Sequence, residues 1–297
     1  EKSSEFHQRY NFGFIASTDY HTARPGTGYR QYERGKMTFA TGVKSKMWEY
    51  QYEADDPNFP EIPKITPGES QPDSERVSSF VYPGGILAVH AKGRGKDEIW
   101  TALKNKNVYG TSGPKILLWF DLMNAPEGKV PMGSEVTMSQ NPRFIVRAAG
   151  SFKQNEGCSD ESIDSLSSER LEYLCAGECY NPSNEREIIE KIEIIKITPQ
   201  EYAGEAISPL IQDPWKTIPC QGTGECIIEF EDQNFSRDSV YYVRAIQSLT
   251  PAINGSPLSQ RDDFELCKGS FRTDLKDNCL SMTNERAWSS PIYVDKP

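Results

Sequence analysis

The stretch from residue 11 to residue 28, NFGFIASTDYHTARPGTG, holds the residues best suited to chemistry. The apolar run Phe12–Ile15 predicts a buried strand, and Asp19 and His21 follow it two positions apart. Because positions i and i+2 of an extended chain point to the same side, a carboxylate and an imidazole are offered together at a strand end. A divalent metal such as Zn, Mn or Fe suits these two ligand types. A hydrogen-bonded turn also uses Asp in this way, and the spacing alone leaves both interpretations open.

Arg24 is the cation closest in sequence to this pair. A guanidinium suits phosphate or carboxylate, so Arg24 is a candidate contact for a substrate anion. The chain contains neither a Gly-x-Ser-x-Gly nucleophile elbow nor a Gly-x-Gly-x-x-Gly fingerprint. No catalytic residue is therefore assigned beyond the candidate metal ligands.

The stretch FGFIASTDYHTARPGTG resembles the last metal-binding motif of the PHP (polymerase and histidinol phosphatase) superfamily of metal-dependent phosphoesterases. More narrowly, it is similar to a PHP-like bacterial family, the domain-of-unknown-function family 3604. Residues 84–116, GGILAVHAKGRGKDEIWTALKNKNVYGTSGPKI, resemble the segment that follows in that family. Residues 240–255 and 284–294 also resemble it, so the similarity extends over nearly the whole chain.

This resemblance implies a distorted (β/α) barrel with several metal ions, where a metal-bound hydroxide attacks a phosphoester or another hydrolysable bond. Asp19 and His21 match the family's last Asp-x-His and become metal ligands, with Arg24 as the anion contact. The family supplies its other ligands, including a His-x-His pair, from a region upstream of this motif. The only histidines here are His7, His21 and His90. We therefore expect the C-terminal part of a larger protein, inactive alone, with an incomplete or absent metal site.

The charge balance and the lengths of the apolar runs exclude two kinds of partner. With 43 acidic against 33 basic residues the formal net charge is −10, and no basic face for nucleic acid is evident. The longest apolar run, Ile116 to Phe120, is far too short to span a membrane. We expect a small-molecule substrate and the upstream part of the same protein as partners; the oligomeric state is left open.

Seven cysteines favour disulfides, and with them a periplasmic or extracellular location. A zinc site would need Cys-x-x-Cys pairs or added histidines, which the cysteine clusters lack. Short loops between neighbouring cysteines can close as local bridges where the geometry permits. The predicted bridges are Cys220–Cys226, Cys267–Cys279 and one within the cluster of Cys158, Cys175 and Cys179.

The fold class is α+β and mainly β. Residues 1–114 are predicted to be the C-terminal part of the barrel, with a Pro-rich excursion at 53–76. Residues 115–297 are predicted to form an antiparallel, sandwich-like domain with a Cys-bearing surface insertion at 151–187. The clearest helix is Asp97–Lys106, whose apolar residues recur at helical spacing. The expected strands are Ile116–Leu122, Phe144–Ala149, Ile188–Thr198, Cys226–Phe230, Val240–Ile246 and Pro291–Val294.

Some local features carry further expectations. In Lys191–Ile197 the alternation shifts phase by one, which predicts a β-bulge. The Gly/Ser-rich stretch Gly110–Pro114 reads as a plain turn, since it lacks the Gly-Lys-Ser/Thr of a phosphate-binding loop. The alternative to a hydrolase is a non-catalytic, disulfide-stapled β-sandwich that serves as an accessory or binding module of the cell envelope. The tryptophans of such a module could line a sugar or protein surface, but most lie in patterns typical of a core: Trp48, Trp100, Trp119, Trp215 and Trp288.

Overall fold

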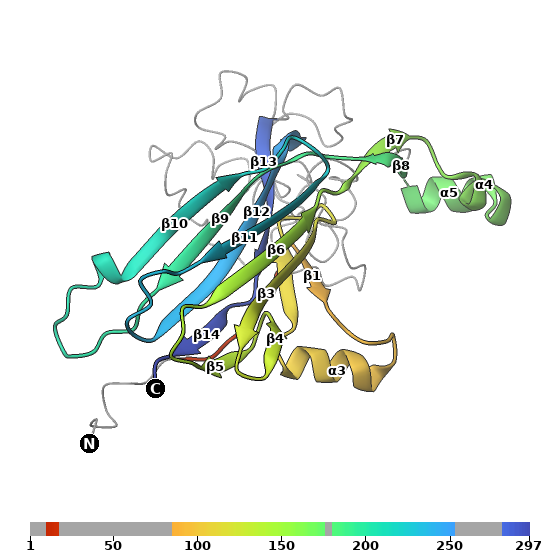
Figure 1. Ribbon diagram of the computed structural model, residues 1–297. Coiled ribbons are helices and arrows are strands. Elements are labelled where there is room, and N and C mark those ends of the chain that lie inside the picture. Colours follow the sequence, from red (N-terminus) through yellow and green to blue (C-terminus); the bar gives the residue numbers. More distant parts are fainter. Residues whose placement is uncertain (1–9, 18–84, 176–179, 253–280) are drawn as a thin grey trace, which may run out of the picture.

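A computed structural model describes residues 10–17, 85–175, 180–252 and 281–297 (Figure 1). This part of the chain is mainly β, with few helices and several sheets, and its strands do not close into a barrel. The Pro-rich segment 53–76 lies outside the described residues. Among the helices that are described, none is long and apolar enough to cross a membrane.

The larger sheet has eight strands, and β12 lies at its centre. One side of β12 pairs with β9, which in turn pairs with β10; the other side pairs with β13 and β14. Strand β13 pairs further with β2, and β2 pairs with β1. Strand β14 pairs with β5, which is the only parallel neighbour in the described sheets. The strands are β1 (Ile86–Val89), β2 (Val108–Thr111), β5 (Glu135–Thr137), β9 (Ile189–Ile197), β10 (Ile211–Pro219, preceded by the 3-10 turn Ser208–Leu210), β12 (Ser239–Ala252), β13 (Ser281–Ser289) and β14 (Ile292–Asp295).

The smaller sheet, in the order β11-β6-β3-β4, lies against one face of the larger sheet. Aromatic side chains from both sheets meet between them. The Phe144 ring centroid lies 4.9 Å from that of Phe230 and 4.8 Å from that of Tyr241. Burying a side chain of this size stabilises the fold by roughly 1.5–3 kcal/mol. The strands are β3 (Leu117–Ala125), β4 (Gly128–Pro131), β6 (Arg143–Ala149) and β11 (Glu225–Glu231).

All six predicted strands are confirmed, but the predicted bulge in Lys191–Ile197 is wrong. Over this range β9 pairs with β12 without a register shift. Ile194 belongs to the core, while Ile195 is fully buried on the opposite face, beside its cross-strand partner Tyr242. Because both faces are covered here, consecutive isoleucines need no bulge. The irregularity lies instead in β10, between Gln212 and Lys216.

Helix α3 (Lys96–Lys104) confirms the predicted helix, although it begins and ends earlier than expected. Its apolar face is only partly covered: Ala102 is buried and Leu103 half-buried, whereas Ile99 and Trp100 are exposed. Of the described tryptophans, Trp215 packs against the core, as expected, while Trp100 does not. Trp100 is exposed, and the half-buried ones are Trp119, Trp215 and Trp288.

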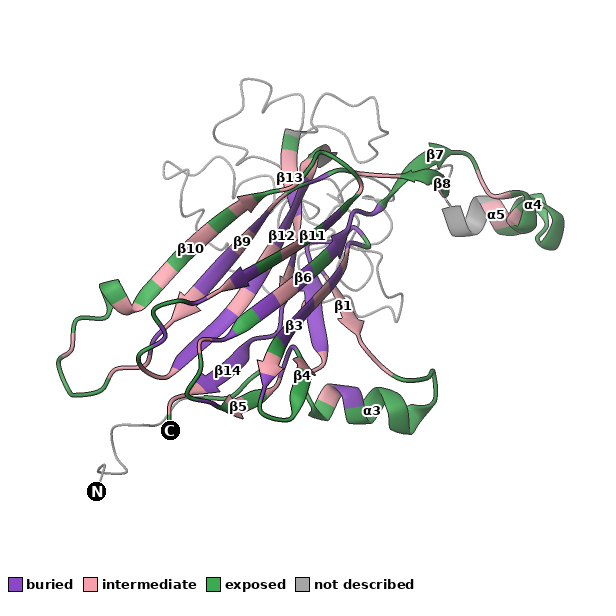
Figure 2. Ribbon diagram, viewed as in Figure 1, coloured by how far each residue is buried: buried purple, intermediate pink, exposed green. Residues whose placement is uncertain are grey.

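An exposed excursion occupies most of the predicted insertion 151–187, whose bounds stay a prediction. A two-stranded ladder, β7 (Phe152–Glu156) and β8 (Tyr180–Arg186), carries helices α4 (Asp160–Ser165) and α5 (Ser168–Cys175) away from the two sheets (Figure 1). We name residues 152–186 the arm. None of its described residues is buried (Figure 2).

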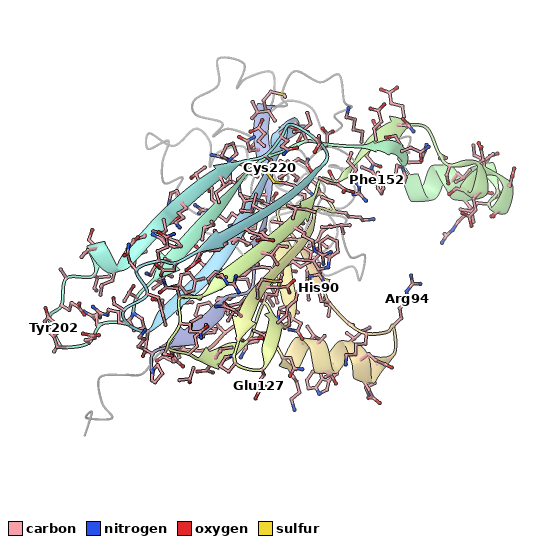
Figure 3. All side chains as sticks on the ribbon, viewed as in Figure 1. His90, Arg94, Glu127, Phe152, Tyr202 and Cys220 are labelled. Atoms are coloured by element: carbon pink, nitrogen blue, oxygen red, sulfur yellow. A yellow bond between two sulfur atoms is a disulfide. The ribbon has the colours of Figure 1, made fainter. Side chains whose placement is uncertain are left out.

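The disulfide Cys220–Cys226 is confirmed, with Cα atoms 5.6 Å apart. It closes the connection between the end of β10 in the larger sheet and the start of β11 in the smaller one (Figure 3). Cys158 is also disulfide-bonded. The other cysteines, whose side chains lie outside the described residues, are Cys175, Cys179, Cys267 and Cys279.

A buried ion pair ties the two sheets together at Asp232, which follows β11. Its carboxylate accepts hydrogen bonds from Lys196 Nζ of β9, from Tyr241 Oη of β12 (2.5 Å) and from the backbone N–H of Asn234 (3.1 Å). Burial opposes ionisation, but these hydrogen bonds and the charge of Lys196 outweigh it and lower the pKa of Asp232. The same burial, helped by Asp232, raises the pKa of Tyr241. Every group in the cluster has a partner, so its role is structural.

We predict that Asp232→Asn lowers the free energy of unfolding at pH 7 by about 3–5 kcal/mol, because Lys196 is left buried without a counter-charge. The pKa of Asp232 lies below its ordinary 3.8 in the folded state. The carboxylate therefore stabilises the fold fully above about pH 4, and this stabilisation is lost as the pH falls through the lowered folded-state pKa. Urea denaturation at pH 7 and pH 3 should show the difference between wild type and variant shrinking at pH 3.

The matched control is the double variant Asp232→Asn/Lys196→Met, which removes both charges and should recover part of the loss. A loss of the same size at both pH values would contradict the ionised role of Asp232.

Candidate functional site

The N-terminal segment, residues 10–17, lies on the outer face of the larger sheet, away from the smaller sheet. The Phe12 N–H donates to Tyr293 Oη (2.9 Å), and the Phe14 N–H donates to Ser290 Oγ (3.0 Å). The Phe14 ring meets the ring of Tyr242 edge-on, with centroids 5.1 Å apart. Since Tyr241 and Val243 point into the core, Tyr242 points to the outer face.

The predicted buried strand at Phe12–Ile15 is wrong. These residues belong to no sheet, and Phe12 and Ile15 are 49% and 68% exposed. The backbone of the segment bonds to the hydroxyl groups of Ser290 and Tyr293, and Asn11 Nδ2 donates to the Glu135 carboxylate (2.5 Å). These partners are side chains, not the backbone of a neighbouring strand. The segment is therefore held at a few points along its length, and its apolar side chains are only partly covered.

Two glycines of the larger sheet allow the segment to approach closely. A Cβ on Gly110 of β2 would lie 2.8 Å from the Ala16 Cβ, closer than such atoms pack. A Cβ on Gly85, just before β1, would lie 3.0 Å from the backbone N and O of Ser17. A glycine inside a strand is a known sign of close backbone approach, so the sequence did contain a signal for Gly110.

This close contact lies directly before the Asp-x-His motif in the sequence, since Ser17 is only two residues before Asp19. Asp19, His21 and Arg24 themselves lie outside the described residues, and their convergence on one site stays a prediction. In the larger sheet, Ile86 pairs with Thr111 and Thr111 pairs with Ala287, so Ser17 lies at the end where β1 begins and β2 ends.

The turn after β2 is closed by internal hydrogen bonds. The backbone N–H groups of Ser112 and Gly113 donate to the Arg286 carbonyl (2.9 Å) and to Thr111 Oγ1 (3.2 Å). Ser112 Oγ donates to the buried carboxylate of Glu285 and accepts from the Arg286 N–H (2.9 Å). Because these donors are already used within the chain, the geometry favours the plain turn over a phosphate-binding loop.

The described residues contribute no complete metal centre. They contain no group of three or more His, Cys, Asp or Glu side chains that could hold a metal ion. The ring of His90 bonds through Nε2 to the Leu118 carbonyl (2.8 Å), and its backbone N–H donates to the Asn107 carbonyl (2.9 Å), so it links β1 to β3 (Figure 3). Asp19 and His21 are suitable donors by type, but two ligands do not complete a tetrahedral site.

Residues 2–156 match the family model described as "Protein of unknown function (DUF3604)". The match covers more than half of the 297 residues. The chain belongs to the DUF3604 family. The DUF3604 match includes the N-terminal segment, the Asp-x-His motif, α3 and β7, while the later stretches 240–255 and 284–294 lie beyond it. Comparisons with curated proteins and with solved structures find no match.

The division of this DUF3604 protein near residue 114 stays a prediction. The boundary falls between β2 and β3. Strand β2 pairs with β13, near the C-terminus, while β3 begins the smaller sheet. The sequence reasoning missed four residues that contact the N-terminal segment: Gly85, Gly110, Ser290 and Tyr293. Gly110 had a local signal, whereas the other three depend on contacts between distant parts of the chain.

We predict that Gly110→Ala displaces Ala16 and destabilises the packing of the N-terminal segment on the larger sheet by about 1–3 kcal/mol, as overpacking does elsewhere. Hydrogen exchange should become faster at the Phe12 and Phe14 amides, and thermal unfolding should begin at a lower temperature. The compensating double variant Gly110→Ala/Ala16→Gly should recover most of this loss.

The matched control is Gly93→Ala, where the added Cβ meets only ordinary contacts of 3.5 Å or more with Glu98. Equal effects of the two single variants, or no recovery in the double variant, would contradict the close contact between Gly110 and Ala16.

Proposed function

We propose that this DUF3604 protein is the C-terminal portion of a metal-dependent hydrolase of the phosphoesterase type. In this proposal Asp19 and His21 bind a divalent metal (Zn, Mn or Fe), and Arg24 contacts an anionic group of a small-molecule substrate. The remaining ligands belong to the part of the protein upstream of this chain. The link to the PHP superfamily, with a barrel remnant followed by a sandwich-like domain, is part of the proposal and rests on the resemblance of the motif.

The observation that best supports this proposal is the close contact of Ala16 and Ser17 with Gly110 and Gly85. Covalent geometry keeps the Asp19 Cα within about 7 Å of the Ser17 Cα, because two residues reach no farther. A metal ligand must be held to within a fraction of an ångström, and sites built next to rigid elements meet this need best. The larger sheet offers such a support directly before the motif.

Each candidate residue has a role that suits its chemistry. The carboxylate of Asp19 and the imidazole of His21 would hold the metal, and the planar guanidinium of Arg24 can donate two parallel hydrogen bonds to a phosphate group. A metal bound there would lower the pKa of a water molecule and polarise the phosphoryl oxygen. A periplasmic or extracellular location is supported by the Cys220–Cys226 disulfide.

The first test is the metal content of the full-length protein, measured by mass spectrometry after extensive dialysis. We expect stoichiometric Zn, Mn or Fe in the wild type. Asp19→Ala and His21→Ala should lower metal affinity by more than the roughly 10- to 100-fold typical of losing an outer-shell partner. The control His7→Ala should retain the metal, since His7 is assigned no ligand role.

Loss of metal should abolish hydrolysis of p-nitrophenyl phosphate or its diester in parallel. Full metal occupancy in the Asp19 and His21 variants would overturn the ligand assignment. An absence of metal from the wild type would instead favour the accessory-module alternative.

Arg24 can be tested separately from the metal. We predict that Arg24→Gln raises KM for the phosphoester by about tenfold or more, because a charge-assisted hydrogen bond contributes roughly 1.5–3 kcal/mol. Metal content should not change. Arg24→Lys keeps the charge but loses the planar fork, so it should fall between wild type and Arg24→Gln. Loss of metal from Arg24→Gln, or an unchanged KM, would contradict the anion contact.

A further inference from the structure

Two surfaces outside the candidate site each expose apolar side chains, and one of them is mainly basic while the other is mainly acidic. The first, the helix surface, consists of α3 and the loop before it, residues 92–106. It exposes Ile99 and Trp100, the latter 60% exposed. The second, the arm tip, consists of residues 156–170 around α4 and the start of α5. It exposes Ile163 and Leu166.

The described residues of the arm bury little apolar surface, although the disulfide of Cys158 adds a covalent link at its tip. A two-stranded ladder is marginal in water, and helices shorter than about 12–15 residues are marginal without tertiary packing. Helices α4 and α5 have six and eight residues, and none of the described arm residues is buried. Phe152, at the base of the arm, is 40% exposed, and the guanidinium of Arg186 lies over its ring at 4.0 Å. A second surface that covers the tip would complete this element.

The charges of the two surfaces are complementary. The helix surface carries five basic side chains (Lys92, Arg94, Lys96, Lys104 and Lys106) against two acidic ones. The arm tip carries five acidic side chains (Glu156, Asp160, Glu161, Asp164 and Glu169) against one basic one. A basic cluster is unusual in a chain whose net charge is −10, and complementary potentials steer association and select partners.

The arm and α3 do not contact each other through hydrogen bonds or ion pairs within the described part of one chain. Figure 1 shows α3 and the arm extending from the sheets toward the same side, at opposite ends of the molecule. Arg94 points away from the sheets on that side (Figure 3). A rotation by 180° about an axis between the two elements would bring each arm tip of a pair of molecules toward the helix surface of the other.

We propose that two copies of this chain associate by exchanging arms. The acidic arm tip of each copy docks on the basic helix surface of the other, Ile163 and Leu166 cover Ile99 and Trp100, and the contact forms twice around a two-fold axis. A self-complementary contact of this kind closes after two subunits, because each copy contributes both surfaces once. The proposal does not depend on the hydrolase function.

Analytical ultracentrifugation tests it first. At about 100 μM, where even a weak and transient complex is populated, we expect a dimer that dissociates as salt rises from low to high concentration. A wild-type chain that stays monomeric under these conditions overturns the proposal. So does a dimer whose stability is independent of both surfaces in the variants below.

Charge reversal gives the sharpest test. The loop variant Lys92→Glu/Arg94→Glu/Lys96→Glu has two acidic surfaces, and the arm variant Asp160→Lys/Glu161→Lys/Asp164→Lys has two basic ones. Each alone should dimerise at least about tenfold more weakly than wild type, since like charges then meet. Mixed together, they should form a one-to-one heterodimer, because each acidic surface then faces a basic one. Failure of the mixture to associate, with both variants folded by circular dichroism, overturns the arm exchange.

The apolar contact is tested with controls matched in residue type and exposure. Trp100→Ala should weaken dimerisation about tenfold or more, as loss of a central aromatic contact does at interfaces. Tyr202→Ala, which alters a 61% exposed aromatic side chain far from both surfaces (Figure 3), should leave the dimer unchanged. Ile163→Asp should likewise break the dimer, while Ile207→Asp should not, although the two isoleucines are similarly exposed (53% and 57%). Equal effects within either matched pair contradict the docking surface.

Discussion

The larger sheet must be covered on both faces, and the rest of the structure depends on this constraint. Along β12, Tyr241, Val243 and Ala245 point into the core, where the smaller sheet covers them. The alternate residues point outward, and Ile246 among them is as well buried as the core residues. Because apolar side chains on both faces of this sheet are buried, its outer face must also be covered by other parts of the chain. Part of the cover for its outer face is the N-terminal segment, held by the ring of Phe14 against Tyr242.

This constraint connects the fold to the candidate site. The hydroxyl groups of Ser290 and Tyr293 accept hydrogen bonds from the backbone of the N-terminal segment, and Gly85 and Gly110 leave room for Ala16 and Ser17. The segment therefore lies in one place along the sheet although it forms no strand. Asp19 and His21 follow it directly. The sheet takes no part in the proposed chemistry. Its role is to hold the backbone directly before the proposed ligands Asp19 and His21 in place.

The strands, the main helix and the Cys220–Cys226 bridge could be predicted because their signals are local: residue periodicity, turn residues and short loop lengths. The errors concern surfaces that distant residues cover or leave open. Ile195 is buried where alternation predicts exposure, while Ile99 and Trp100 are exposed where helical periodicity predicts packing. The helices of the arm were missed although Ser159 and Ser167 cap them through their side chains, which is a local signal. For the candidate site, the residue types and the resemblance suggested Asp19, His21 and Arg24. Apart from Gly110 inside a strand, no local pattern could show which residues anchor the chain before them.

The most direct test of the central claim is a crystal structure of the full-length protein grown with Mn²⁺, with the metal located by its anomalous signal. We predict an Asp19 carboxylate oxygen and a His21 ring nitrogen each within about 2.3 Å of the same ion, at the end of the larger sheet where β1 begins. Side chains of Asp19 and His21 more than about 6 Å apart, or directed into separate packed regions, would contradict it.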